Sequence, residues 1–482
     1  MTALDLRAKA AHGTMVVSIL SVIGTLLERL SQFILPLYLT PLDFGLFALA
    51  VSFYGVLGIV GELGMTTYLV RVREGFEDVA GTAFVLRLGL SLVLIMGSVG
   101  LGWLASHVYS DSRLLIPIVV LAVGLILQSF AMVPRAVAFR KLDFSRAAVP
   151  DSVGKFVGVF ATIALAIAGF AYWSPVYGTI AGLSVGTSLL IATSRWRPKL
   201  GFRPETARKI LSFGGVVALS TFAAFIARFV DYAVVGFFLG VAVLGYYSIA
   251  FSWGVNFAGN LSSILTYTSY SILSNVADVP ARSRRVYLEN LRYYTYLAPC
   301  LSIGVAVLAP QLVLGIYGSA WSPAIVVMQV LAPVGVLVGY GALASDALYA
   351  LGRPKIILFV SWLEAAILVT IVPPATILFG LLGTGLAVFL GVTIVTALMT
   401  RHAARALGIS RGDVLPLGRN SAITVLGAAG AGFAVSSLLP ASFLALVVGT
   451  ATIVFFYVGI WELLTRGRYL EDLWKVIGRA FS

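Results

Sequence analysis

Long apolar runs, separated by short polar breaks, fill almost the whole chain. A run of about 20 apolar residues is long enough to cross a bilayer as a helix. By that measure the pattern predicts 14 spans, at residues 15–39, 44–70, 80–107, 114–134, 149–170, 175–193, 211–238, 242–273, 293–318, 325–348, 356–376, 380–400, 419–438 and 442–464. We place the break after the eleventh span at Pro373-Pro374, because proline interrupts helices. The expected fold class is all-α, a polytopic membrane protein.

The basic residues alternate between the two sides of this pattern. Eight breaks, counting both chain ends, hold 28 of the 33 lysines and arginines, and the opposite breaks hold only Arg113. Cytoplasmic loops carry the excess of Lys and Arg, so we expect both termini in the cytoplasm. The net charge of +13 then follows from membrane topology and attraction to membrane lipids, and no nucleic-acid partner is expected.

Composition agrees with a membrane protein and offers little for catalysis. The chain is 60% hydrophobic and 11% charged, whereas soluble domains are about 25% charged. Its one cysteine and three scattered histidines form no metal-ligand or nucleophile pattern, so we expect no metal and no cofactor. The predicted outer loops are short and nearly uncharged, which leaves no room for an outer catalytic domain.

Two parts of the chain resemble each other. When Arg29 is aligned with Arg228, the stretch Gly45–Ala50 falls opposite Gly245–Ala250, with a spacing of 16 residues in the first copy and 17 in the second. Internal repeats of this kind are typical of transporters whose substrate site lies between two halves, near mid-membrane. We therefore predict two pseudo-symmetric six-helix bundles that alternate access. The predicted domains are an N-terminal bundle, a basic cytoplasmic linker, a C-terminal bundle, and a region with two extra helices and a tail, at residues 1–194, 195–210, 211–401 and 402–482.

Several charges fall inside the predicted spans, where they are costly and mark pathways, partner pairs or ligand sites. Three arginines form the predicted substrate site for a pyrophosphate, because a guanidinium stays protonated and binds two oxygens at once: Arg29, Arg87 and Arg228. Four carboxylates are assigned to ion coupling or charge pairing: Glu28, Glu62, Asp231 and Glu364. The alternative is that these charges pair between helices and fix packing. Arg228 and Asp231 have the spacing for a pair on one helix face.

Glycines recur at helical spacing in two predicted spans. Gly178, Gly182 and Gly186 repeat every four residues, and Gly55, Gly58, Gly61 and Gly64 repeat every three. Small residues at these intervals let two helix backbones approach closely in a membrane. We interpret both series chiefly as packing surfaces.

Four stretches carry a resemblance to a known family: Leu39–Ala50, Arg135–Phe144, Tyr317–Ala324 and Ala350–Lys355. In order and placement they resemble the polysaccharide-exporting, Wzx-like branch of the multidrug/oligosaccharidyl-lipid/polysaccharide (MOP) flippase superfamily. The resemblance implies a V-shaped pair of bundles around a cationic cavity in the bacterial inner membrane. It also implies translocation of a polyprenyl-pyrophosphate-linked oligosaccharide to the outer leaflet, with a polysaccharide polymerase and other assembly proteins as partners.

Other functions stay open at this point. The two extra helices are similar to those of lipid II flippases, which keeps a peptidoglycan-precursor substrate as an alternative. A drug/cation antiporter of the same superfamily would prefer an acidic cavity, which the interior arginines oppose. A membrane polysaccharide polymerase or ligase would need a larger outer loop. A scaffold that transports nothing would tolerate the loss of Arg29 and Arg228.

Overall fold

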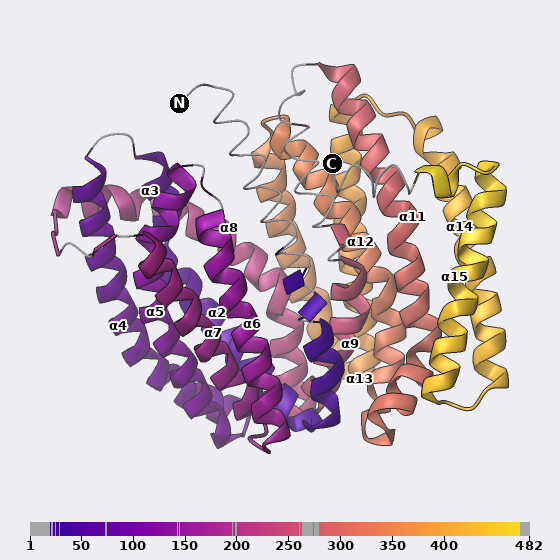
Figure 1. Ribbon diagram of the computed structural model, residues 1–482, viewed down its shortest axis with the longest axis horizontal. Coiled ribbons are helices and arrows are strands. Elements are labelled where there is room, and N and C mark those ends of the chain that lie inside the picture. Colours follow the sequence, from indigo (N-terminus) through magenta and orange to yellow (C-terminus); the bar gives the residue numbers. More distant parts are fainter. Residues whose placement is uncertain are drawn as a thin grey trace. The chain divides into compact units, whose positions relative to one another are not determined.

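The computed structural model describes residues 20, 23–24, 26–27, 29–72, 75–141, 143, 145–194, 196–197, 200–259, 261–262, 273 and 279–472, without the side chains of 216–218 and 220. The chain divides into two compact units, Met1–Gly245 and Tyr246–Ser482. This division falls later in the chain than the predicted linker at 195–210. The described residues form helices and no strand, as the all-α prediction requires (Figure 1).

The described residues of the first unit form six long helices and several short segments. Its elements are η1 (Leu35–Leu37), α2 (Pro41–Glu62), α3 (Met65–Arg71), α4 (Phe76–Val108), η2 (Ser112–Leu114), α5 (Leu115–Arg140), α6 (Ser145–Ile167), α7 (Trp173–Ser194), α8 (Pro204–Leu239) and the start of α9 (Val241–Phe251). One predicted span is broken into α2 and α3 by Leu63 and Gly64, which both have positive φ, at 40° and 62°. A left-handed conformation is rare for leucine and ends α2 at this point.

The second unit continues from α9 through a π-helical turn, η3 (Ser252–Asn256). Its other elements are α11 (Pro280–Leu312), η4 (Val313–Tyr317), η5 (Ser319–Trp321), α12 (Ala324–Ala350), α13 (Pro354–Ala406), α14 (Arg411–Leu438) and α15 (Phe443–Thr465). The range given for α13 covers two helices that meet at Gly380, whose φ of 59° and ψ of −143° are not helical. There the hydroxyls of Thr376 and Thr384 lie 2.8 Å apart across the turn.

The position of this turn corrects the sequence prediction. Pro373 and Pro374 lie inside the helix and do not end it, whereas the chain reverses at Gly380. Prolines are tolerated within membrane helices because neighbouring groups satisfy the freed carbonyls. The backbone conformation at Gly380 is one that glycine adopts without steric cost.

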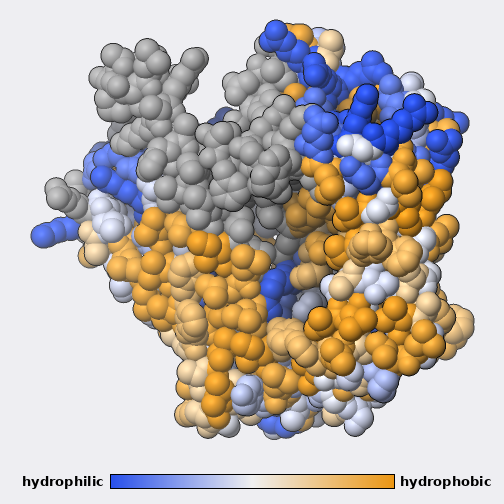
Figure 2. Space-filling view, turned by 45° about the vertical axis from the view of Figure 1, so that its right-hand side comes forward, coloured by the Kyte–Doolittle hydropathy of each residue, from blue (hydrophilic) through white to orange (hydrophobic). Residues whose placement is uncertain are grey.

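Twelve of the described helical segments are long and apolar enough to cross a membrane. One of them is α13, which combines two predicted spans, and the first predicted span, 15–39, lies largely outside the described residues. The count is therefore consistent with the prediction of about 14 helices. Figure 2 shows a broad hydrophobic surface below a cap of hydrophilic residues on the part at its right. The protein is a multi-span membrane protein.

The glycine series in α7 packs against α6 at backbone contact. A Cβ at Gly182 would lie 2.7 Å from the carbonyl oxygen of Gly154, and one at Gly158 would lie 3.0 Å from the carbonyl oxygen of Gly178. The predicted close packing is thus confirmed for α6 and α7. The series in α2 behaves differently, because Gly55 meets Phe225 whereas a Cβ at Gly58 would touch nothing within 4 Å.

The two last helices are docked along α11. Gln311 donates a hydrogen bond from Nε2 to the carbonyl oxygen of Ser436 at 3.1 Å. Toward the other end, Trp461 is 1% exposed and its ring stacks on Tyr469, and both rings contact Tyr296 of α11. Figure 1 shows α14 and α15 beside α11. Helices α14 and α15 therefore belong to the packed core of the second unit.

Candidate functional site

Arg87 is the most deeply buried charge among the predicted site residues that the structure describes. It lies on α4 and is 2% exposed. Its NH2 group donates to Oε1 of Gln128 on α5 at 3.1 Å, while Nε and NH1 have no hydrogen-bond partner among the described residues. A buried guanidinium with two unused nitrogens is unfavourable unless another group satisfies it. This burial places the side chain of Arg87 in the protein interior.

The surroundings of Arg87 are polar although all the elements are membrane helices. Gln128 donates from Nε2 to the hydroxyl of Tyr54 on α2 at 2.6 Å. Ser91 and Ser129, each one turn or less from these residues, share a hydrogen bond of 3.0 Å. Sequence reasoning missed Tyr54 and Gln128. A glutamine inside an apolar span was the signal that could have identified the second.

Glu62 is an acidic group that acts electrostatically on Arg87. It lies at the end of α2 and contributes to the electrostatics at the guanidinium together with Tyr54 and Arg135. Its Oε1 accepts a hydrogen bond from the backbone N–H of Thr66 at 3.1 Å, which caps the first turn of α3. The hydrogen bonds and ion pairs of the described residues do not join Glu62 to Arg87.

Arg228 has the opposite environment from Arg87. It is exposed, near the middle of the apolar segment Thr221–Leu239 of α8. Within the described part of the chain its guanidinium has no hydrogen-bond or ion-pair partner. Asp231 on the same helix is 3% exposed, and its Oδ1 accepts from the N–H of Tyr232 at 2.9 Å. The two side chains do not form the pair that their spacing allows, because one is buried and the other is exposed.

The remaining predicted residues are Arg29, Glu28 and Glu364. Arg29 is half-buried and donates from NH1 to Oε1 of Gln32 at 2.6 Å. Glu28 lies outside the described residues. Glu364, in the first half of α13, is half-buried, and its carboxylate has no hydrogen-bond or ion-pair partner among the described residues.

The structure thus brings some predicted residues together and not others. Glu62 acts on Arg87 electrostatically in the first unit without a hydrogen bond or ion pair to it, and Arg228 and Asp231 share α8. Among the described residues the hydrogen-bond partner of Arg87 is Gln128, and no hydrogen bond joins Arg87 to Arg29 or Arg228. Glu364 belongs to the second unit. The three arginines remain a predicted site.

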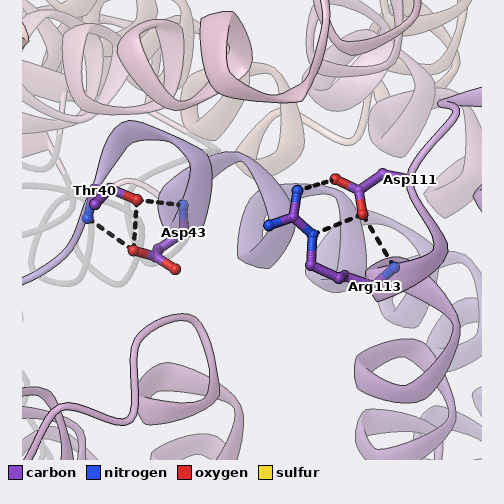
Figure 3. A network of polar contacts seen from close by, with 4 residues as sticks. All are labelled: Thr40, Asp43, Asp111 and Arg113. Carbon is purple, nitrogen blue, oxygen red and sulfur yellow. Dashed lines mark hydrogen bonds and ion pairs between the residues drawn. The ribbon is translucent and has the colours of Figure 1, made fainter.

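A second polar network lies where α2 begins (Figure 3). The hydroxyl of Thr40 and the carboxylate of Asp43 form a capping box, and Asp43 also accepts from the N–H of Tyr172 at 3.1 Å. Beside it, Arg113 donates two side-chain hydrogen bonds to Asp111, at 2.9 and 2.7 Å. Burial acts to raise the pKa of Asp111, but the hydrogen bonds from Arg113 outweigh it and hold that pKa below its ordinary value. The capping box of Thr40 and Asp43 fixes the first turn of α2, and Asp111 caps η2 by accepting from the N–H of Arg113.

Residues 34–326, more than half of the chain, match a family described as polysaccharide biosynthesis proteins. The chain belongs to this family. It is 26% identical over 326 residues to the succinoglycan biosynthesis transport protein ExoT of Rhizobium meliloti, a match that covers 65% of this chain and 64% of ExoT. It is 21% identical over 399 residues to the lipopolysaccharide biosynthesis protein WzxC of Escherichia coli, covering 82% and 80% of the two chains.

Solved structures agree on the fold. The lipid II flippase MurJ in an inward closed conformation has a TM-score of 0.73 and 14% identity, covering 93% of this chain and 98% of MurJ. An inward-facing multidrug transporter of the MOP superfamily has a TM-score of 0.63 and 17% identity, covering 79% and 94%. The resemblance predicted from the sequence is confirmed for family and fold.

Proposed function

We propose that the protein is a flippase that moves a polyprenyl-pyrophosphate-linked oligosaccharide from the cytoplasmic to the outer leaflet by alternating access. Membership of the polysaccharide biosynthesis family supports this proposal, as do the similarity to ExoT, which is named as a transport protein, and to WzxC, which is named as a lipopolysaccharide biosynthesis protein. The substrate carries a dianionic headgroup, a polar glycan and an apolar tail. A membrane protein that moves it needs cationic groups at membrane depth.

The single observation that carries the proposal is the exposure of Arg228 at membrane depth. It is an exposed arginine near the middle of a membrane helix, without a partner among the described residues. Such a charge is costly, and residues of this kind face a water-filled cavity or a ligand. The planar guanidinium of Arg228 can donate hydrogen bonds to two phosphate oxygens at once. The polymerase and ligase alternative is disfavoured by the short breaks 109–111 and 439–442, which hold no separate outer domain.

The finer organisation belongs to the same proposal. We place the protein in the bacterial inner membrane with both termini in the cytoplasm, on the distribution of lysine and arginine. The two six-helix bundles at 1–194 and 211–401 are the proposed moving parts, and Arg29 and Arg87 are further proposed contacts of the headgroup. Glu28, Glu62, Asp231 and Glu364 are the proposed ion-coupling or charge-pairing groups. A polysaccharide polymerase is the proposed downstream partner.

Replacing Arg228 with alanine is expected to slow export. A charge-assisted hydrogen bond is worth about 1.5 kcal/mol or more, so losing it should reduce transport at least about tenfold. The measurement is made in a host strain that lacks the gene. Complemented cells are fractionated, and the complete lipid-linked oligosaccharide is assigned to the inner or outer leaflet.

The matched control is Arg208→Ala, an exposed arginine of the same helix near its cytoplasmic end. Arg208→Ala should export normally, Arg228→Lys should export partly, and Arg228→Ala should trap the oligosaccharide on the cytoplasmic face. If the complete oligosaccharide instead reached the outer leaflet and stalled there unpolymerised, the flippase proposal would fail and a polymerase would replace it.

A further inference from the structure

Two glycines in equivalent repeat positions each lie against backbone atoms of the helix that carries the other. A Cβ at Gly45 of α2 would overlap the carbonyl oxygen of Val241, and a Cβ at Gly245 of α9 would overlap the carbonyl oxygen of Pro41. Pro41 and Val241 are the first residues of these two helices. The contact is therefore reciprocal, because each glycine touches the first residue of the helix that carries the other.

This reciprocity matches the internal repeat. Pro41 and Gly45 align with Val241 and Gly245 in the register in which Gly45–Ala50 faces Gly245–Ala250. Both glycines are buried, and so are Leu49 and Ile249, which are 1% exposed. We call the four residues Pro41, Gly45, Val241 and Gly245 the glycine seam.

The glycine seam depends on the absence of side chains. Close approach of two helices through glycines gains many weak contacts without freezing any side-chain rotamer. Among the described residues, no hydrogen bond or ion pair crosses from α2 to α9 at these four positions, so the contact has no charge to break when the helices part. Such a contact can close tightly and still open reversibly.

The two sides of the seam are anchored differently. On one side, the capping box of Thr40 and Asp43 fixes the first turn of α2 (Figure 3). On the other side, α9 starts after Gly240, whose φ of 96° and ψ of 162° separate it from α8. Glycine tolerates a wide range of backbone conformations, so α9 can change direction at Gly240 while the start of α2 stays fixed.

We propose that the glycine seam is an outer gate, which is closed in this structure and opens when α9 moves away from α2 to release the substrate. The proposal rests on the proposed function and on the topology that places the start of α2 outside. It assigns Gly45 and Gly245 as positioning residues that set the balance between closed and open states. A methyl group at either glycine should therefore favour the open state.

The test measures access from outside and not transport. An Ala224→Cys reporter in a Cys300→Ala background places a thiol on α8, one turn before Arg228 and exposed like it. A membrane-impermeant maleimide is added to intact cells. Gly45→Ala and Gly245→Ala should each raise the labelling rate about tenfold, the change produced by about 1.4 kcal/mol between two states.

The matched control is Gly100→Ala on α4, where a Cβ would meet nothing within 4 Å. It should leave the labelling rate unchanged. The double variant Gly45→Ala/Gly245→Ala should label more slowly than the product of the two single effects predicts, because parting α2 and α9 at one glycine also relieves the overlap at the other, whereas two uncoupled changes would multiply. Folded variants that label at the wild-type rate would overturn the inference.

A second measurement leaves both glycines intact and so does not depend on the folding of the variants. Spin labels at Tyr38→Cys and Ala242→Cys, both exposed positions beside the seam, report the separation of α2 and α9. Added polyprenyl pyrophosphate should increase a second, longer distance. If the two spin labels show a single distance that polyprenyl pyrophosphate does not change, the gate proposal is overturned. If the gate opens but the leaflet assay shows no flipping, the proposed function fails and the gate stands.

Discussion

Gly182→Leu is expected to prevent the first unit from folding. The Cβ alone would lie 2.7 Å from the carbonyl oxygen of Gly154 and 3.2 Å from the Cα of Gly158, and these are backbone atoms that cannot rotate away. Overpacking of a well-packed core costs about 1–3 kcal/mol when side chains can adjust, and more when they cannot. Helices α6 and α7 would have to separate along the face that holds them together.

Detergent-solubilised protein measures this effect by gel filtration and by thermal unfolding. Gly182→Leu should give little monodisperse protein, and Gly182→Ala should fold with a lowered Tm. The control is Gly97→Leu on α4, where a Cβ has no neighbour within 4 Å and the leucine faces outward. Equal elution and equal Tm for Gly182→Leu and Gly97→Leu would show that the backbone contact does not hold these helices together.

The sequence is sufficient to predict those features that depend on hydrophobic length and residue size. Apolar runs of membrane-spanning length predict the helices, and glycines every four residues predict a close-packing face on α7, which the structure shows against α6. The repeat around Gly45 and Gly245 is likewise evident from the residues alone. These signals are local, because the bilayer fixes the length of a span and a glycine marks a close approach.

The orientation of the interior charges is not predictable in the same way. Lipid tails are as apolar as a protein core, so the hydrophobic pattern does not tell which side of a membrane helix faces the protein. Spacing puts Arg228 and Asp231 on one face, yet Asp231 is buried and Arg228 is exposed. Likewise the reversal at Gly380, and not at Pro373, depends on how the two halves of α13 pack.

Arg87→Met is expected to stop export and to raise the Tm. The guanidinium leaves Nε and NH1 without partners among the described residues at 2% exposure, so its burial costs free energy that methionine, of similar length, would not. Replacing buried charges by apolar residues is often neutral or stabilising, by about 1–4 kcal/mol. If the headgroup or another anion accepts hydrogen bonds from Nε and NH1 of Arg87 during transport, Arg87→Met removes that interaction. Its loss costs up to about 3 kcal/mol and should reduce export roughly 100-fold.

Arg140→Met is the matched control because the same substitution should change the Tm in the opposite direction. Arg140 is half-buried in the same unit, donates to the carbonyl oxygens of Leu69 and Val72, and lies 4.4 Å from the centroid of the Phe76 ring. Its loss removes satisfied contacts and should lower the Tm. Both values come from thermal unfolding, and export comes from the leaflet assay.

The two readouts separate a functional arginine from a structural one. A structural Arg87 would behave like Arg140, with a lower Tm for Arg87→Met and export that falls only in proportion to the amount of folded protein. A stable protein without export would show that the polar cluster of Tyr54, Arg87 and Gln128 is retained for transport at a cost in stability. The first unit would then contain a second cationic contact, distinct from the exposed Arg228.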